Sequence, residues 1–138
     1  MIVVDTSVWI DYFRRIETPA TLFLLRGHVQ PRRIIVGDVV LLEVLMGARD
    51  ERMAERLAGL LATFRQEALL TPETAPLAAE NYRRLRAVGV TPRQTTDLIV
   101  ASFCIAWGHE LLFSDRDFLP MVTHLGLRPA MASGSESR

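Results

Sequence analysis

Short apolar segments alternate along this chain with longer segments whose apolar residues recur at helical spacing. The short segments are apolar or β-branched, predict strands, and span residues 2–4, 34–36, 67–70 and 111–113. The longer segments predict helices and span residues 7–15, 19–27, 39–48, 51–65, 73–87 and 96–107. Strands that alternate with helices favour β-α-β units. We therefore predict an α/β fold with a central parallel sheet of four to five strands, covered by helices on both faces.

The length of the chain fits a single domain. Its 138 residues are enough to bury a core without disulfides or a structural metal. No internal repeat and no linker interrupts the alternating pattern. We expect one domain over residues 1–130, followed over residues 131–138 by a disordered tail of small and polar residues.

Several features favour a cytoplasmic protein that does not enter a membrane. No uncharged run reaches the ~18 residues that a membrane span needs. The first apolar stretch lacks a basic region and contains Asp5 and Asp11, which is unlike a signal peptide. The single cysteine, Cys104, excludes an intrachain disulfide and a cysteine-based zinc site, and its apolar surroundings predict an inert core thiol.

All basic residues of the sequence are arginines. The 16 arginines balance 16 acidic residues, and lysine does not occur. This absence excludes P-loop and Schiff-base chemistry, both of which need a lysine. It also excludes response-regulator receivers and haloacid-dehalogenase-type phosphatases, whose acidic pockets contain one.

Two carboxylates of the first half of the chain stand at unusual positions. Asp5 directly follows the strand predicted over residues 2–4, where it could serve as a helix N-cap or as a site residue. Glu43 lies in a helical segment that is apolar on every face, which predicts a buried helix. No basic residue lies within one turn of Glu43. A distant arginine could still pair with it, but a metal or functional site is the favoured interpretation.

Further carboxylates stand at comparable positions in the second half. Asp97 opens the helix predicted over residues 96–107, where it could also complement the helix dipole. Asp115 and Asp117 follow the strand predicted over residues 111–113, in a turn where local hydrogen bonding is the alternative interpretation. A parallel sheet can bring these elements together at one edge. Converging carboxylates repel unless a cation neutralises them, and oxygen ligands select Mg²⁺ or Mn²⁺ over zinc.

Four segments of the sequence resemble the PIN-domain ribonucleases, and among them the VapC toxins of toxin–antitoxin pairs. They are VVDTSVWID at residues 3–11, LEVLMGAR at residues 42–49, TDLIVA at residues 96–101 and SDRDF at residues 114–118. The resemblance covers nearly the whole chain in order. It implies a single PIN-like domain and a magnesium-dependent endoribonuclease, the toxin of a type II system.

The resemblance also implies roles for individual residues. Asp5, Glu43 and Asp97 match the metal-site acids of the family, and Asp115 matches the usual fourth position. Asp117 is either a fifth acid or a residue that holds the turn, and Thr6 matches a hydroxyl that supports the metal or its water. Members often have Asn where this chain has Ser114, which leaves the choice between Asp115 and Asp117 open.

The chemistry of phosphodiester hydrolysis suggests a separate role for each of these acids. Our hypothesis is that Asp5 and Asp97 bind the principal Mg²⁺ directly, with Mn²⁺ as a possible substitute. Glu43 and Asp115 would act through water, by orienting the nucleophile or holding a second ion.

The expected partners are an RNA substrate, a VapB-like antitoxin and a second copy of the chain. The candidate RNA-binding residues are Arg14, Arg15, Arg32, Arg33, Arg93 and Arg116, although solvated surface arginines are the alternative interpretation. Bulky apolar residues of the first two helices predict either core packing or a groove for an antitoxin helix. The remaining functional alternatives are a PIN-like binding module without turnover and a housekeeping PIN ribonuclease.

Overall fold

Five parallel strands form the centre of the molecule in the computed structural model, which describes residues 1–27 and 29–131. The strands are β1 (Ile2–Val4), β2 (Ile34–Gly37), β3 (Arg65–Glu67), β4 (Glu110–Leu112) and β5 (Arg128–Pro129). Their order across the sheet is β3-β2-β1-β4-β5. The central strand β1 pairs on one side with β2 and on the other with β4, so that Ile2 faces both Ile34 and Glu110.

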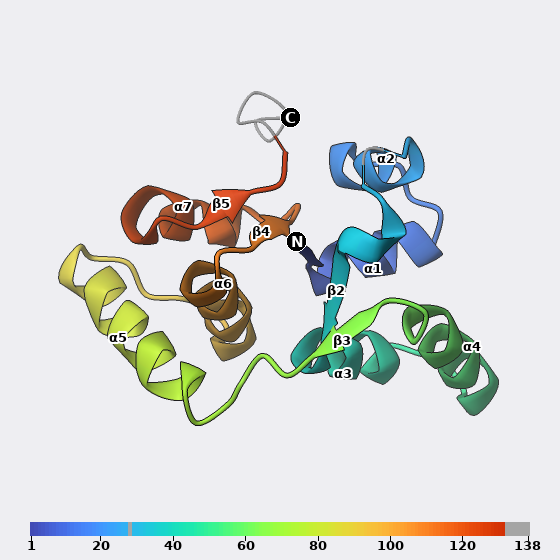
Figure 1. Cartoon of the computed structure of the whole chain (residues 1–138), viewed down its shortest axis with the longest axis horizontal. Coiled ribbons are helices and arrows are strands. Elements are labelled where there is room, and N and C mark those ends of the chain that lie inside the picture. The colour runs from blue at the N-terminus through green and yellow to red at the C-terminus, as the bar shows by residue number, and fades with distance from the viewer. Residues whose placement is uncertain (28, 132–138) are drawn as a thin grey trace.

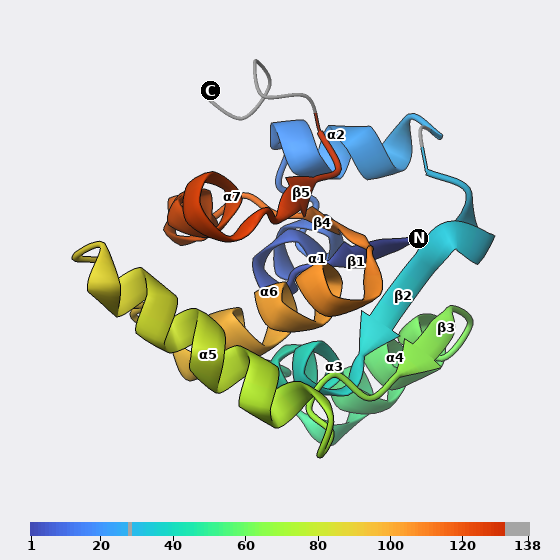
Figure 2. The ribbon, with the colours of Figure 1, turned by 60° about the vertical axis from the view of Figure 1, so that its left-hand side comes forward.

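Helices cover both faces of this sheet (Figure 1). They are α1 (Thr6–Phe13), α2 (Pro19–Leu25), α3 (Asp38–Met46), α4 (Glu51–Leu61), α5 (Thr74–Ala87), α6 (Thr95–Trp107) and α7 (Leu119–Leu125), with 3-10 turns η1 (Pro31–Arg33) and η2 (Arg116–Phe118). Helices α1, α2 and α4 lie on one side of the sheet, and α5, α6 and α7 lie on the other (Figures 1 and 2). Helix α3 lies at the end of β2 against α1, α4 and α6. The predicted α/β fold is confirmed.

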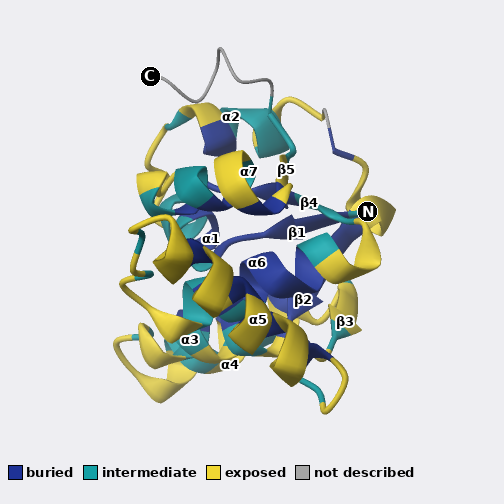
Figure 3. Cartoon of the chain, turned by 90° about the vertical axis from the view of Figure 1, so that its left-hand side faces the viewer, coloured by how far each residue is buried: buried dark blue, intermediate teal, exposed yellow. Residues whose placement is uncertain are grey.

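The core lies between the central strands and the inner faces of the helices (Figure 3). Val3, Val4, Ile35 and Leu111 are fully buried, because β1, β2 and β4 have helices on both faces. Burying each such side chain contributes roughly 1.5–3 kcal/mol. The core also encloses Cys104, whose burial raises the pKa of the thiol to about 12, as expected for an inert core thiol.

Capping residues explain where several helices begin and end. The side chains of Thr18 and Asp50 accept hydrogen bonds from backbone N–H groups in the first turns of α2 and α4. Gly108 ends α6 with φ of 72° and Gly126 ends α7 with φ of 79°, a left-handed conformation that favours glycine.

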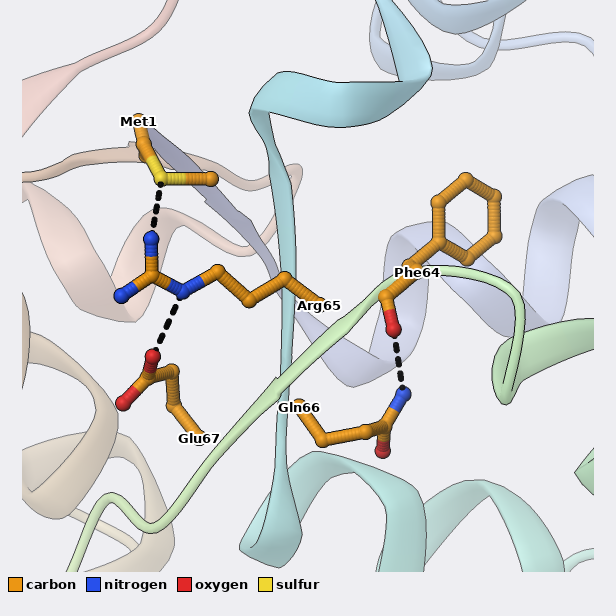
Figure 4. A network of polar contacts seen from close by, with 5 residues as sticks. All are labelled: Met1, Phe64, Arg65, Gln66 and Glu67. Atoms are coloured by element: carbon orange, nitrogen blue, oxygen red, sulfur yellow. Dashed lines mark hydrogen bonds and ion pairs between the residues drawn. The ribbon is translucent and has the colours of Figure 1, made fainter.

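The edge strand β3 differs from the strand expected over residues 67–70. It begins at Arg65 and is polar, because an edge strand does not need two apolar faces (Figure 4). Arg65 Nε donates a hydrogen bond to Glu67 Oε2 at 2.6 Å, and Arg65 Nη1 lies 3.3 Å from Met1 Sδ. The apolar residue Leu69 is buried in the connection that follows β3. The helix expected over residues 51–65 is correspondingly shorter and ends at Leu61.

The last part of the fold contains two elements that the sequence pattern did not predict. These are α7, a short helix, and β5, a strand of only two residues that completes the sheet. The tail expected over residues 131–138 lies outside the described residues except for Met131. Within the described ranges, no helix combines the length and apolar character needed to cross a bilayer.

Candidate active site

The carboxyl edge of the central strands positions the candidate site. Strand β1 leads through Asp5 into α1, β2 leads into α3, and β4 is followed by the turn that contains η2. Helix α6 runs in the opposite direction to the strands, since its last residue is followed closely by the start of β4. Its first turn, with Asp97, therefore lies at the same edge. This edge is where open α/β sheets place their ligands.

Asp5 is a buried residue at the end of β1, with only 5% of its surface exposed. Its backbone N–H donates to the carbonyl of Leu112 at 2.9 Å, which joins the ends of β1 and β4. Asp5 occupies the N-cap position of α1, but its side chain makes no capping hydrogen bond. Its carboxylate accepts a hydrogen bond from Ser7 Oγ at 3.0 Å instead.

Burial controls the ionisation of Asp5. The loss of water around the carboxyl raises its pKa from 3.8 to about 6, with a further rise from the charge of Glu43. The hydrogen bond from Ser7 opposes this rise but does not cancel it. A carboxylate held at this energetic cost is typical of a functional site.

Glu43 and Thr6 join helix α3 to helix α1. Thr6 Oγ1 donates a hydrogen bond of 2.7 Å to Glu43 Oε1, and both residues are half-buried. Among the residues that the structure describes, Glu43 forms no ion pair, so the alternative of a distant arginine partner is not supported.

The expectation that α3 is buried on every face is wrong. The helix packs through Val40 and Val44, which are buried, whereas 58% of Leu42 and 74% of Met46 is exposed. A helix at the edge of the sheet meets neighbours on only part of its circumference, so uniform apolar character does not ensure uniform burial.

Three carboxylates form a compact group at the start of α6 and the end of β4. Asp97, Asp115 and Asp117 each offer an oxygen, and these oxygens lie within 4.8 Å of one another. The N–H of Asp117 donates to Asp115 Oδ1 at 2.9 Å, which orders the turn. Arg93 Nη1 lies 3.9 Å from Asp117 Oδ2. Hard divalent cations prefer oxygen donors arranged in this way.

The electrostatic field of the site couples this group to Asp5 and Glu43. The pKa of Asp97 rises from 3.8 to about 7. Burial is the largest cause, followed by the negative charges of the four other site acids, which are Asp5, Asp115, Glu43 and Asp117. All five sequence-predicted acids therefore lie close enough to influence one another's charge through Asp97.

The candidate arginines lie at four different places. Arg93 and Arg116 flank the acids, and Arg14 directly follows α1 and lines a groove between α1, α3 and α4. Arg15, with φ of 59°, lines a separate groove between α1, α2 and α4. The remaining two, Arg32 and Arg33, lie in η1 before β2, at the opposite edge of the sheet from the acids, where Arg33 Nη2 lies 3.9 Å from Glu110 Oε1.

Ser7, next to Asp5, and Arg49, after α3, were not among the sequence candidates. Ser7 donates the hydrogen bond to Asp5, and Arg49 lines a groove between α1, α3 and α4. Both lie inside the segments that carry the family resemblance, since Ser7 follows Asp5-Thr6 and Arg49 follows Gly47-Ala48. Proximity to the acids in these segments was the available signal.

The family of the chain follows from a match between residues 2–121 and the model of the PIN domain family. The chain belongs to this family, as its resemblance implied. It is 30% identical over 122 residues to the VapC ribonuclease Mb1587 of Mycobacterium bovis, which covers 86% of this chain and 89% of the relative. The protein is a VapC-type PIN-domain ribonuclease.

Solved structures support the fold. VapBC2 from Rickettsia felis, bound to a DNA fragment from its promoter, is similar with a TM-score of 0.75 and 17% identity, over 94% of this chain and 97% of that chain. VapC20 of Mycobacterium tuberculosis, a toxin that cleaves the sarcin-ricin loop, is similar with a TM-score of 0.66 and 20% identity, over 94% and 100% of the two chains.

Proposed function

We propose that this protein is the toxin of a type II toxin–antitoxin system and cuts RNA in the cytoplasm with a divalent metal ion. The observation that carries the proposal is the group Asp97, Asp115 and Asp117 beside the buried Asp5, in a chain of the VapC type. PIN nucleases generally depend on divalent metals. Mg²⁺ is the ion we propose here, with Mn²⁺ as a substitute.

The donor set of the site fits such an ion. Its ligands are all carboxylate oxygens, and the raised pKa of Asp97 shows that their negative charges are poorly compensated. Among the described residues, the one ion pair to this group is that of Arg93 with Asp117, at 3.9 Å. A divalent cation would supply the missing positive charge, and the histidine and cysteine ligands that zinc favours do not belong to the group.

Each residue has a defined part in the proposed reaction. Asp97, Asp115 and Asp117 would hold the metal, with Asp5 as a further ligand from β1. When bound, Mg²⁺ lowers the pKa of a coordinated water and neutralises charge on the phosphoryl oxygens. Glu43, whose carboxylate accepts a hydrogen bond from Thr6, would act through water, by orienting the nucleophile or holding a second ion.

The test is RNA cleavage by Asp97→Asn in the presence of Mg²⁺, with Asp11→Asn as a matched control on α1 outside the site. Asp97→Asn is expected to lose cleavage by at least about 100-fold and to lose the stabilisation by Mg²⁺ in thermal melts. Full activity of this variant would contradict the proposal. RNA binding without cleavage by the wild-type protein would instead favour a PIN-like module without turnover.

The groove between α1, α2 and α4 supports a VapB-like antitoxin as the partner. It has a volume of about 580 Å³, and the exposed apolar residues Ile16, Leu25 and Leu60 line it. The buried Nε1 of Trp9, which also lines this groove, has no hydrogen-bond partner in the described structure. A helix with an apolar face fits such a groove.

Inhibition by the antitoxin tests this groove. Leu25→Arg places a charge on the exposed apolar surface of the groove. It is expected to leave RNA cleavage intact and to weaken inhibition by the antitoxin about tenfold. Unchanged inhibition of Leu25→Arg would exclude this groove as the antitoxin site.

A homodimer is also part of the proposal. The exposed apolar side chains Leu42 and Met46 on α3, and Leu77 on α5, offer surface that a second copy would cover. Light scattering after size-exclusion chromatography measures the mass directly. Met46→Arg is expected to shift a dimer toward the monomer.

A further inference from the structure

A second groove lies between α1, α3 and α4. It has a volume of about 350 Å³ and begins one helical turn beyond two residues of the site. Ile10 follows Thr6 by one turn of α1, and Gly47 follows Glu43 by one turn of α3. One turn advances a helix by about 5.4 Å, so the groove is within reach of whatever binds at the acids.

The lining of this groove combines an apolar floor with a basic rim. Phe13, Val44 and Leu57 contribute to the floor, and Arg14 and Arg49 contribute the charges. Among the described residues that line it, none is acidic. The ion pair between Arg49 Nε and Asp50 Oδ2, at 3.8 Å between two exposed side chains, leaves Arg49 largely available, because surface pairs are weak. The groove therefore suits a ligand with an apolar surface and a negative charge.

Gly47 indicates that the groove is kept open. Its φ is −83°, an ordinary helical value that any residue adopts. A Cβ atom at this position would come no closer than 3.5 Å to another atom, which is ordinary van der Waals contact. Neither backbone conformation nor packing therefore requires glycine here. What a larger side chain would change is the space in the groove.

We propose that this groove is an RNA subsite, which binds the base and phosphate of the nucleotide next to the scissile bond. The inference rests on the proposed ribonuclease activity and adds the place where the substrate strand is held. The base lies on the apolar floor, and its phosphate contacts Arg14 and Arg49, whose guanidinium groups suit phosphate. The size of the groove, near the lower limit of roughly 300 Å³ for small-ligand sites, fits one nucleotide better than a peptide helix.

The position of the groove gives the strand a path across the site. Strand β1, with Asp5, lies between β2 and β4. The groove lies at the C-terminal end of α3, the helix that follows β2, and Arg93 and Arg116 lie beside the turn that follows β4. A bound strand would thus meet basic side chains on both sides of the acids, with the scissile phosphate between them.

The test measures RNA binding in the Asp97→Asn background, which is expected to prevent cleavage, with a short fluorescein-labelled single-stranded RNA of mixed sequence. Gly47→Leu fills the groove without backbone strain and is expected to weaken binding about tenfold. Gly59→Leu is the matched control, because Gly59 lies on α4 with open space around it and does not line the groove. Thermal melts of both variants verify that they fold.

Arg49→Ala provides a second, independent measurement. It is expected to reduce the slope of log affinity against log salt concentration by about 0.7, the value for one lost contact to a single-stranded phosphate. Arg52→Ala, an exposed arginine of α4 outside the groove, should leave the slope unchanged.

The outcomes separate this inference from the proposed function. Unchanged RNA binding and an unchanged salt slope in both variants would overturn the subsite, even if the wild-type protein cleaves RNA. Loss of antitoxin inhibition alone, with normal RNA binding, would also overturn it and assign the groove to the antitoxin. Failure of the wild-type protein to cleave any RNA would refute the proposed function on separate grounds.

Discussion

Replacing Asp5 by asparagine is expected to stabilise the metal-free protein, and to do so more at high pH than at low pH. The buried carboxyl of Asp5 has a pKa of about 6, compared with an ordinary value of 3.8. The folded chain therefore retains this proton over a pH range in which the unfolded chain has lost it. Consequently, the contribution of Asp5 to the free energy of unfolding falls as the pH rises from about 4 to about 6. Asparagine carries no charge and still accepts the hydrogen bond from Ser7.

The magnitude follows from the two pKa values. Their difference lowers the free energy of unfolding by about 3 kcal/mol at pH 8 and by roughly half as much at pH 5. The benefit of Asp5→Asn over the wild-type protein should thus be roughly 1–2 kcal/mol larger at pH 8. For a chain of this length, this corresponds to a difference of roughly 3–8 °C in Tm.

Thermal melts in a chelator at pH 5 and pH 8 measure this difference, with Asp11→Asn as the control on the same helix. Adding Mg²⁺ at pH 8 should raise the Tm of the wild-type protein more than that of Asp5→Asn, because the ion compensates a charge that the variant lacks. The reasoning is refuted if the Tm of Asp5→Asn exceeds that of the wild-type protein by no more at pH 8 than at pH 5. An equal rise in Tm for Asp11→Asn would attribute the effect to net charge rather than to the burial of Asp5.

Three further substitutions test the packing and the metal group. Gly37→Ala should lower the free energy of unfolding, measured by urea denaturation, by roughly 1–3 kcal/mol, because the new Cβ would lie 2.3 Å from the side chain of Leu69. An unchanged free energy of unfolding would show that Leu69 moves freely. Asn81→Ala removes a buried hydrogen bond of 3.0 Å from Asn81 on α5 to Ser102 on α6. It should lower the free energy of unfolding by roughly 1–3 kcal/mol. The double variant with Ser102→Ala should cost less than the sum of the single variants, and strict additivity would exclude the coupling. Asp117→Asn should raise the Mg²⁺ concentration for half-maximal stabilisation at least about tenfold, and an unchanged titration would exclude Asp117 from the metal group.

The sequence predicted the centre of the fold better than its margins. Strands β1 and β2 follow from apolar runs, since a strand with helices on both faces must be apolar throughout. The edge strand β3 has one neighbouring strand and is polar, so the apolar residues after Glu67 suggested a strand where a connection lies. Helix α7 and strand β5 are too short for hydrophobic periodicity to indicate them.

The proximity of several acids was also predictable, because Asp5 and Asp115 follow strands and Asp97 begins a helix at the carboxyl edge of the sheet. The sequence could not predict which of them come closest together. That Asp115 and Asp117 both approach Asp97 depends on a turn whose geometry is set by the backbone of η2. By contrast, Arg32 and Arg33 precede the strand predicted over residues 34–36, so their position at the far edge of the sheet from the acids followed from the sequence.

The assembly of the site from four distant chain segments has a consequence for the timing of toxicity. Asp5, Glu43, Asp97 and Asp115 come together only when β1, β2, β4 and α6 have packed into one sheet-and-helix unit. Contacts between segments so distant in the sequence slow the folding of a chain. We expect a growing chain to lack nuclease activity until all four segments have packed together, and a chain that is cut between them to lose it.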